Sequence, residues 1–155
     1  MEVRAATGPE VEAARVLTDR SWLATYAPLI GEAATRAIVA ERHAAEVFAR
    51  QAAANLFLVA LDGGTVVGHA HAMPKDGHYL DRLHVEPGLK GRGIGRTLMA
   101  AVEAAREPRQ RFWLDVLEGN DAALGFYARL GFREVARTEA CGGLAGIPAV
   151  VMEKD

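Results

Sequence analysis

The stretch LDRLHVEP at residues 80–87 runs directly into GLKGRGIGR at residues 88–96 and then into TLMAAVEAA at residues 97–105. The first segment is typical of an extended strand, and the last is an apolar run of helix formers. The glycines between them allow positive φ angles and let a ligand come close to the backbone. Because a helix that begins in such a turn presents free N–H groups, the stretch predicts a phosphate or pyrophosphate site.

The charge of this turn also favours a polyphosphate. Its glycines, Gly91, Gly93 and Gly95, lie among the basic residues Lys90, Arg92 and Arg96. Two familiar phosphate motifs fit poorly, since Arg96 follows Gly95 where a P-loop has lysine and Leu98 stands where a Rossmann fingerprint has Gly or Ala. The turn therefore matches neither the P-loop nor the Rossmann fingerprint.

A second strand and helix follow downstream. RFWLDV at residues 111–116 is typical of a strand, and GNDAALGFYARLGF follows at residues 119–132. Asn120 or Asp121 can cap the helix in this segment, and Gly131 is placed to end it. The chain thus contains two consecutive strand-turn-helix units.

Together these segments resemble the GNAT superfamily of acyl-coenzyme-A-dependent N-acetyltransferases. The resemblance covers residues 79–132. It rests on Leu83-x-Val85-x-Pro87, on a basic residue and Gly-x-Gly-x-Gly at residues 90–95, on Asn120-x-x-Ala-x-x-Phe-Tyr ending at Tyr127, and on Gly131-Phe132. It is specific for the cofactor, acetyl-CoA, and says little about the acceptor.

The patterns along the chain predict the element order β-α-α-β-β-β-α-β-α-β-β in one domain, residues 1–155. Strands are expected at residues 2–6, 56–61, 65–73, 79–85, 111–116, 133–138 and 149–153, and helices at residues 8–22 and 31–53, with a break near His43, and after each glycine-containing turn. A glycine-rich loop is expected before the last strand. The resemblance implies an α/β fold whose mixed sheet opens between Leu83-His84-Val85 and Leu114-Asp115-Val116.

The resemblance also implies how acetyl-CoA is held. Its pantetheine arm would bond to the backbone of the strand, and its pyrophosphate would rest on the amides of residues 91–96. The residues expected to bind it are Leu83, His84, Val85, Lys90, Gly91, Arg92, Gly93, Ile94, Gly95, Arg96, Asn120 and Tyr127.

Attack by an amine on a thioester needs a base, donors for an oxyanion and an acid for the thiolate. The resemblance implies that Tyr127 is the acid, and the Val85 amide is the expected oxyanion donor. Asn120 would orient the cofactor arm or a water, or it is simply a helix cap.

The base is expected to be Asp81, acting through water. Period-two alternation puts Asp81 on the strand face of Leu83 and Val85, and puts Arg82 and His84 on the opposite face. His84 and a chain of waters without a dedicated base remain alternatives.

Acceptor recognition is expected in the first two helices, where Trp22 and Tyr26 share a face and Asp19 lies one turn earlier. Two aromatic rings and an acid can hold a cationic amine, although the rings could equally be core residues. The acceptor is a small-molecule amine, a protein N-terminus or a lysine.

His69 and His71, near His78 and His84, are interpreted as ordinary strand histidines, so no metal is expected.

Composition is consistent with this interpretation. The chain has 155 residues, half of them hydrophobic, and a net charge of −2, which gives it a core but no polycationic surface for nucleic acid. The N-terminus does not read as a signal peptide and no apolar run is long enough to span a membrane, so a cytoplasmic location is expected. Cys141 is the single cysteine, so no intrachain disulfide is expected. A homodimer is left open.

Two other functions remain. The first is a regulatory module that binds acyl-CoA without turnover, although the presence of Tyr127 and Asp81 argues against it. The second is a nucleotide-binding protein, which would require that the glycine turn prefer ATP or NAD.

Overall fold

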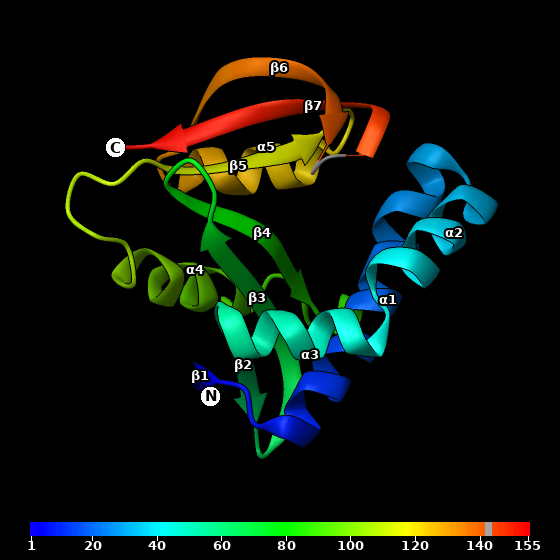
Figure 1. Cartoon of the computed structure of the whole chain (residues 1–155), viewed down its shortest axis with the longest axis vertical. Coiled ribbons are helices and arrows are strands. Elements are labelled where there is room, and N and C mark those ends of the chain that lie inside the picture. The colour runs from blue at the N-terminus through cyan, green and yellow to red at the C-terminus, as the bar shows by residue number, and fades with distance from the viewer. Residues whose placement is uncertain (142–143) are drawn as a thin grey trace.

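A computed structural model describes residues 1–141 and 144–155 of the chain. Within them a seven-stranded sheet carries helices on both faces (Figure 1). The strands are β1 (Glu2–Ala5), β2 (Leu56–Asp62), β3 (Thr65–Pro74), β4 (His78–Val85), β5 (Phe112–Leu117), β6 (Arg133–Cys141) and β7 (Leu144–Lys154). The helices are α1 (Gly8–Ile30), α2 (Glu32–Arg42), α3 (Ala45–Ala54), α4 (Ile94–Ala104) and α5 (Asp121–Arg129), with a 3₁₀ turn η1 (Pro87–Leu89).

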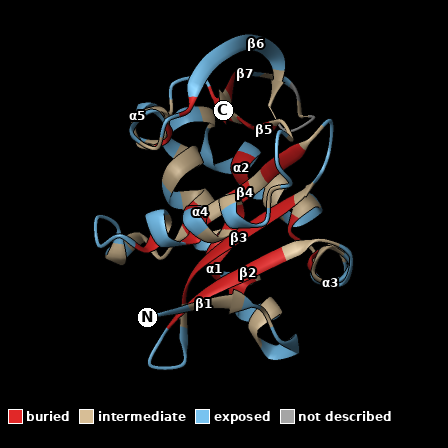
Figure 2. Cartoon of the chain, turned by 90° about the vertical axis from the view of Figure 1, so that its left-hand side faces the viewer, coloured by how far each residue is buried: buried red, intermediate tan, exposed pale blue. Residues whose placement is uncertain are grey.

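The strand order is β1-β2-β3-β4-β5-β7-β6, in which β4 and β5 are parallel neighbours and the other neighbouring strands are antiparallel. The α/β fold and its mixed sheet are therefore as predicted. Helices α4 and α5 cover one face through Leu98, Val102 and Tyr127, and α1 and α3 cover the other through Ala14 and Phe48. Figure 2 shows the buried residues along the middle strands and the exposed ones along β6.

The predicted opening of the sheet is confirmed. Strands β4 and β5 are paired only at His78–Phe112 and Tyr79–Trp113. Beyond Tyr79 they separate, so that no strand of the described residues pairs with the backbone of Leu83 to Val85 on its β5 side. Figure 1 shows β5, β6 and β7 as a group set at an angle to β2, β3 and β4.

A glycine on β3 sets how closely α4 approaches the sheet. A Cβ at Gly68 would lie 2.9 Å from both Ile94 Cγ2 and Leu98 Cδ1. Only glycine lets the first turn of α4 pack this tightly, because packed interiors leave no room for an added methyl group. The turn before α4 is thereby fixed relative to β4.

The structure corrects three predicted boundaries and confirms one predicted helix break. Helix α1 extends beyond residue 22 to Ile30, with Pro28 inside its last turn. The break near His43 is confirmed and separates α2 from a further helix, α3. The glycine-rich loop before the last strand is wrong, because β7 already begins at Leu144; residues 142 and 143 lie outside the described part. Strand β6 likewise continues to Cys141.

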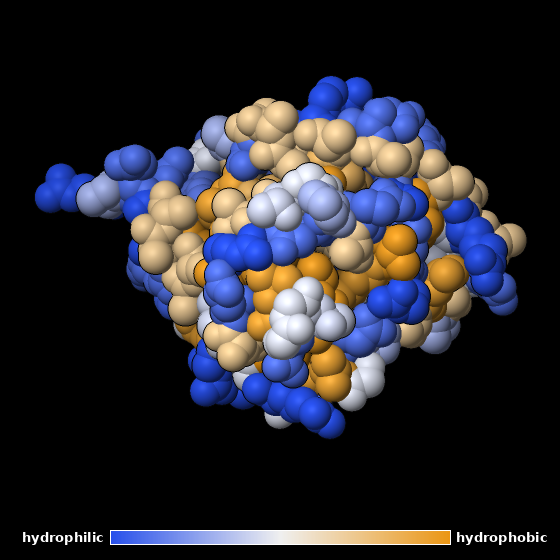
Figure 3. Space-filling model, turned by 90° about the horizontal axis from the view of Figure 1, so that it is seen from below, coloured by the Kyte–Doolittle hydropathy of each residue, from blue (hydrophilic) through white to orange (hydrophobic). Residues whose placement is uncertain are grey.

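The lower surface of the molecule mixes hydrophobic and hydrophilic side chains (Figure 3). In the described part of the chain, no helix is both long and apolar enough to cross a bilayer.

Candidate functional site

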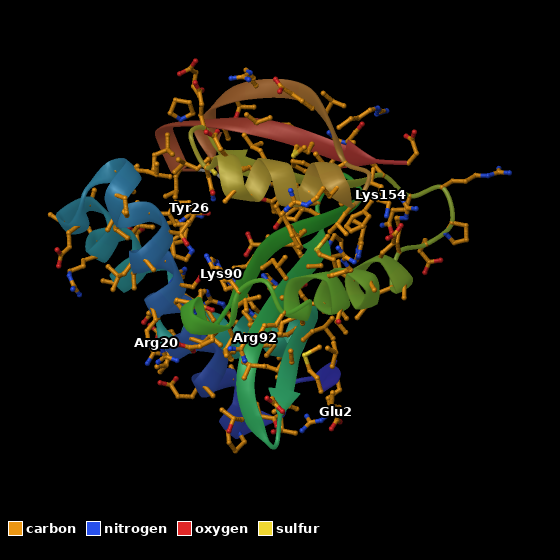
Figure 4. All side chains as sticks on the ribbon, turned by 180° about the vertical axis from the view of Figure 1, so that it is seen from behind. Glu2, Arg20, Tyr26, Lys90, Arg92 and Lys154 are labelled. Atoms are coloured by element: carbon orange, nitrogen blue, oxygen red, sulfur yellow. The ribbon has the colours of Figure 1, made fainter. Side chains whose placement is uncertain are left out.

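The opening between β4 and β5 forms a cavity of about 680 Å³, walled by α1, β4, β5 and α5 and by the turn before α4. Every site residue predicted above lines it except Arg92 and Asp19. These lining residues are Trp22, Tyr26, Asp81, Leu83, His84, Val85, Lys90, Gly91, Gly93, Ile94, Gly95, Arg96, Asn120 and Tyr127. Figure 4 shows Tyr26 on α1, with Lys90 and Arg92 at the start of α4. Segments far apart in sequence thus meet at one cavity.

The turn at residues 90–96, here called the glycine turn, is built for a ligand at the backbone. Gly91 and Gly93 both have φ of 83°, and an added Cβ at either would meet nothing within 4 Å. Gly93 is the left-handed cap of α4, whose ladder begins with the bond from Thr97 N to Gly93 O (3.1 Å). The amides of Ile94, Gly95 and Arg96 therefore have no partner within the helix and suit an anion.

Gly95 has a second reason to be glycine. A Cβ there would lie 3.2 Å from Phe126 Cζ, on α5. The sequence interpretation assigned this glycine only to the approach of a ligand. In the structure it also lets α5 pack against the start of α4.

The cavity also carries positive charge that no carboxylate among the described residues compensates. Lys90, Arg96 and Arg129 line it, and no carboxylate in the described part of the chain pairs with any of them. By contrast, Arg20 on α1 pairs with Glu86, 2.6 Å away, just before η1. Arg129 was missed by sequence reasoning, because it lies one helix away from the glycine turn.

Tyr127 lines the cavity. It is 9% exposed, and its ring packs edge-on against Phe126 and Phe132. Burial and the nearby Tyr26 raise the pKa of Tyr127, so it stays a protonated donor at neutral pH. No described residue hydrogen-bonds its hydroxyl.

Asn120 caps α5, because its side-chain oxygen accepts from Ala123 N at 3.3 Å. The predicted helix-cap role is therefore confirmed. Its predicted contact with a cofactor arm stays a prediction.

Asp81 does not share a face with Leu83 and Val85, so that expectation is wrong. His71 pairs with Arg82 and Ala72 pairs with Leu80, which leaves Asp81 as the extra residue of a β-bulge. The bulge turns its carboxylate toward the α3 face, where it accepts from His71 Nδ1 (2.9 Å) and from the Arg82 guanidinium (3.4 Å). Asp81 still lines the cavity.

These contacts keep Asp81 charged. Burial favours its neutral form, but the bond from His71 and the charge of Arg82 prevail and lower its pKa. His71 is oriented in turn by Asn55, whose Nδ2 lies 3.0 Å from His71 Nε2. Asp81 is thus a fixed anion beside the cavity.

His84 is held by Ser21, whose Oγ lies 2.7 Å from His84 Nδ1. Burial, assisted by the charge of Arg82, lowers the pKa of His84 to about 3. The ring is therefore neutral across the physiological range.

A buried arginine lies beneath this end of the site. Arg82 packs over the Phe48 ring (4.1 Å) and donates to Gln51 Oε1 (2.8 Å) and His69 Nε2 (3.2 Å). Burial lowers its pKa to about 10. His69 is also bonded to Leu58 O, and in the described residues no group of three or more His, Cys, Asp or Glu is arranged to hold a metal.

The α1 end of the cavity is formed by Trp22, Tyr26, His43, Asp81, Asp115 and Cys141. The rings of Trp22 and Tyr26 lie 4.3 Å apart, as their spacing predicted. Asp115 accepts from the Tyr79 hydroxyl at 2.6 Å. Burial raises the pKa of Tyr26 and that of Cys141 to about 12, so both stay protonated and the thiol is a poor nucleophile.

Comparison with known proteins gives one consistent result. Residues 20–132 match the model of the Acetyltransferase (GNAT) family. The chain is 33% identical over 107 residues to N-alpha-acetyltransferase RimI of Mycobacterium tuberculosis, and the match covers 65% of this chain and 66% of that protein. It is 36% identical over 63 residues to peptidyl-lysine N-acetyltransferase YjaB of Escherichia coli, a match that covers 41% of each protein. These matches thus span from two fifths to just under two thirds of the relatives' lengths.

Among solved structures, the fold is similar to that of the PaiA N-acetyltransferase from Thermoplasma acidophilum in complex with coenzyme A. The TM-score is 0.85, with 23% identity and coverage of 99% of this chain and 98% of the other. At this identity the likeness establishes the fold.

Proposed function

The chain belongs to the acetyltransferase (GNAT) family, and from this premise we propose that it transfers the acetyl group of acetyl-CoA to a primary amine within a ternary complex. Residues 1–155 would act as one domain, because one sheet runs through them. The observation that carries the proposal is that a single cavity joins the glycine turn, Tyr127 and the anionic Asp81.

The described residues fit acetyl-CoA. The free amides of residues 94–96 and the unpaired cations Lys90, Arg96 and Arg129 suit its phosphates, and Arg92 lies nearby in the same turn. The unpaired backbone of Leu83 to Val85, with His84 between them, suits the amide groups of a pantetheine arm. Bound there, acetyl-CoA supplies an activated acetyl group as a thioester.

The protein's own groups would do the rest. The Val85 amide would donate to the developing oxyanion, and Tyr127 would donate its proton to the departing sulfur. Asp81 would attract the ammonium group of the acceptor, because it is anionic and lines the cavity near Trp22. A small-molecule amine, a protein N-terminus and a lysine side chain all present such a group.

Ligand binding provides the first test. Acetyl-CoA should raise the melting temperature, whereas ATP and NAD should not, because a ligand that binds only the folded state stabilises it by mass action. A larger shift with NAD or ATP would favour a nucleotide-binding protein instead.

The Gly93→Val substitution tests the glycine turn, and the chain offers a matched control. Gly93 and Gly64 both have φ of 83° and open space at Cβ, but Gly64 lies in the β2–β3 turn, outside the cavity. Calorimetry should detect no acetyl-CoA binding by Gly93→Val and normal binding by Gly64→Val. Equal affinities for the two variants would contradict the assignment of the glycine turn.

Turnover is then tested by offering amines and N-terminal or lysine-containing peptides together with acetyl-CoA and measuring free thiol. Release of thiol that depends on the amine supports an enzyme. Tight binding of acetyl-CoA with no release for any amine would favour the regulatory module.

A further inference from the structure

Transfer of an acetyl group to an ammonium requires that nitrogen lose a proton before it attacks. Asp81 is ill-suited to take that proton, because His71 and Arg82 already occupy its Oδ2 and stabilise its charge. His84 is bonded to Ser21 and its pKa is about 3. A different group in the cavity has the geometry of a base.

That group is His43, which ends α2 and lines the α1 end of the cavity. Its Nδ1 lies 2.9 Å from Asp19 Oδ1, on α1. Arg15 Nη1 donates to both members of this pair, at 3.4 Å from Asp19 Oδ2 and from the His43 carbonyl oxygen. Since a carboxylate oxygen only accepts, Nδ1 carries the proton and Nε2 has a free lone pair.

Nε2 faces the cavity. No described residue hydrogen-bonds it, and among these residues every buried polar side-chain atom has a partner, so Nε2 must reach accessible space. The ring is otherwise enclosed, with Trp22 and Phe48 packed edge-on at 5.4 and 5.6 Å. The cavity that His43 lines is therefore the space that Nε2 meets.

We propose that His43 is the general base of the acetyl transfer and that Asp19 is its positioning residue. The inference rests on the acetyltransferase activity proposed above. The N–H bond of the bound ammonium breaks and its proton moves to His43 Nε2. The amine nitrogen then bonds to the thioester carbon, the C–S bond breaks, and the second nitrogen proton ends on sulfur by way of Tyr127. The proton on His43 leaves to solvent through the cavity.

The charges around His43 suit this role. Arg15 and Asp19 face it from α1, and Asp81, Arg82 and His84 face it from β4. Arg42 precedes it in the chain. Burial and the charge of Arg82 lower the pKa of His43, while Asp19 opposes the shift. The ring is therefore neutral near pH 7 and ready to accept a proton.

The closing experiment uses His43→Asn. The asparagine amide can still donate to Asp19, as Nδ1 does, but Nε2 is lost. With an amine that the wild-type protein acetylates, kcat near pH 7 should fall about 10²-fold and should rise again at high pH, where free amine is abundant. Acetyl-CoA affinity should not change. As a matched control, His78→Asn removes a buried histidine that bonds Val102 O outside the cavity, and should keep wild-type kcat.

A second variant and a second readout test the positioning role. Asp19→Asn should lower kcat by about tenfold or more and should change the tautomer of His43, which ¹⁵N NMR of the resting protein detects without any acceptor. A His43→Asn protein with wild-type kcat and pH profile would overturn the inference and return the base to Asp81, His84 or water. A wild-type protein that binds acetyl-CoA but acetylates no amine would instead contradict the proposed activity itself.

Discussion

Burial fixes the protonation state of most side chains around the cavity. Tyr127, Tyr26 and Cys141 all have raised pKa values because their anions would lie in a poorly solvated wall. The acid Asp81 has a lowered pKa instead, because the β-bulge places its carboxylate against His71 and Arg82. The site therefore combines neutral proton donors with the anionic Asp81, as the proposed acetyl transfer to an ammonium group would use.

Removal of the Tyr127 hydroxyl tests the acid. Tyr127→Phe keeps the ring between Phe126 and Phe132 but leaves no proton to donate, so kcat should fall about 10²-fold while acetyl-CoA affinity stays the same. Because its pKa is raised above 10, wild-type kcat should not decline between pH 7 and about pH 9 through ionisation of this group. Pre-steady-state measurement of thiol release checks both. A variant with undiminished kcat, where chemistry limits the rate, would make Tyr127 a packing residue.

The close contact of α4 with β3 carries the glycine turn, and Gly68→Ala tests it. A Cβ 2.9 Å from Ile94 and Leu98 must push α4 outward, at a cost of about 1–3 kcal/mol in the free energy of unfolding, and should weaken acetyl-CoA binding. Gly8→Ala, where an added Cβ meets nothing within 4 Å, is the control and should change neither. Urea denaturation and calorimetry measure the two effects. Full stability of Gly68→Ala would mean that α4 can shift without consequence.

Local chemistry explains which elements the sequence could predict. The glycine turn, the Asn120 cap and the sheet opening follow from residues that are close in the chain or from the family resemblance, and the structure contains all three. The bulge at Asp81 depends on which residues β3 offers opposite β4, and a single strand pattern carries no such information. For the same reason His43 looked only like a helix break, since its partner Asp19 lies 24 residues away.

The start of β7 and the third helix also depend on contacts between segments that are distant in the chain. Strand β7 reaches back to Leu144 because its first residues pair with the end of β6, where Leu144 lies opposite Cys141, whereas its pairing with β5 begins only at Ala149. The pairing with β6 prevails over the local preference of glycine for a loop. The third helix, α3, is anchored by Phe48 in the core between α1 and β2. Both outcomes were decided by tertiary contacts.

Acid should destabilise the whole molecule through its buried histidines. His43, His69 and His84 are buried, and burial is the first cause that lowers each pKa. In the unfolded chain each ring titrates near pH 6.5, so below that pH the unfolded state binds more protons than the folded one. Stability is therefore complete above about pH 6.5 and should decrease as pH falls from there toward the folded-state pKa values.

The expected slope of the unfolding free energy against pH follows from the number of these histidine rings. Each contributes about 1.4 kcal/mol per pH unit where only its unfolded form is protonated, so unfolding free energies from urea titrations should fall steeply between about pH 6.5 and pH 5. Carboxylates with lowered pKa values, such as Asp81, act below this window because they titrate from 3.8 downward. His84→Asn, which can keep a hydrogen bond to Ser21 but cannot titrate, should reduce the slope by about 1.4 kcal/mol per pH unit. An unchanged slope in that variant would mean that His84 gains its proton in the folded state as readily as in the unfolded one, and that the cavity wall around it admits water.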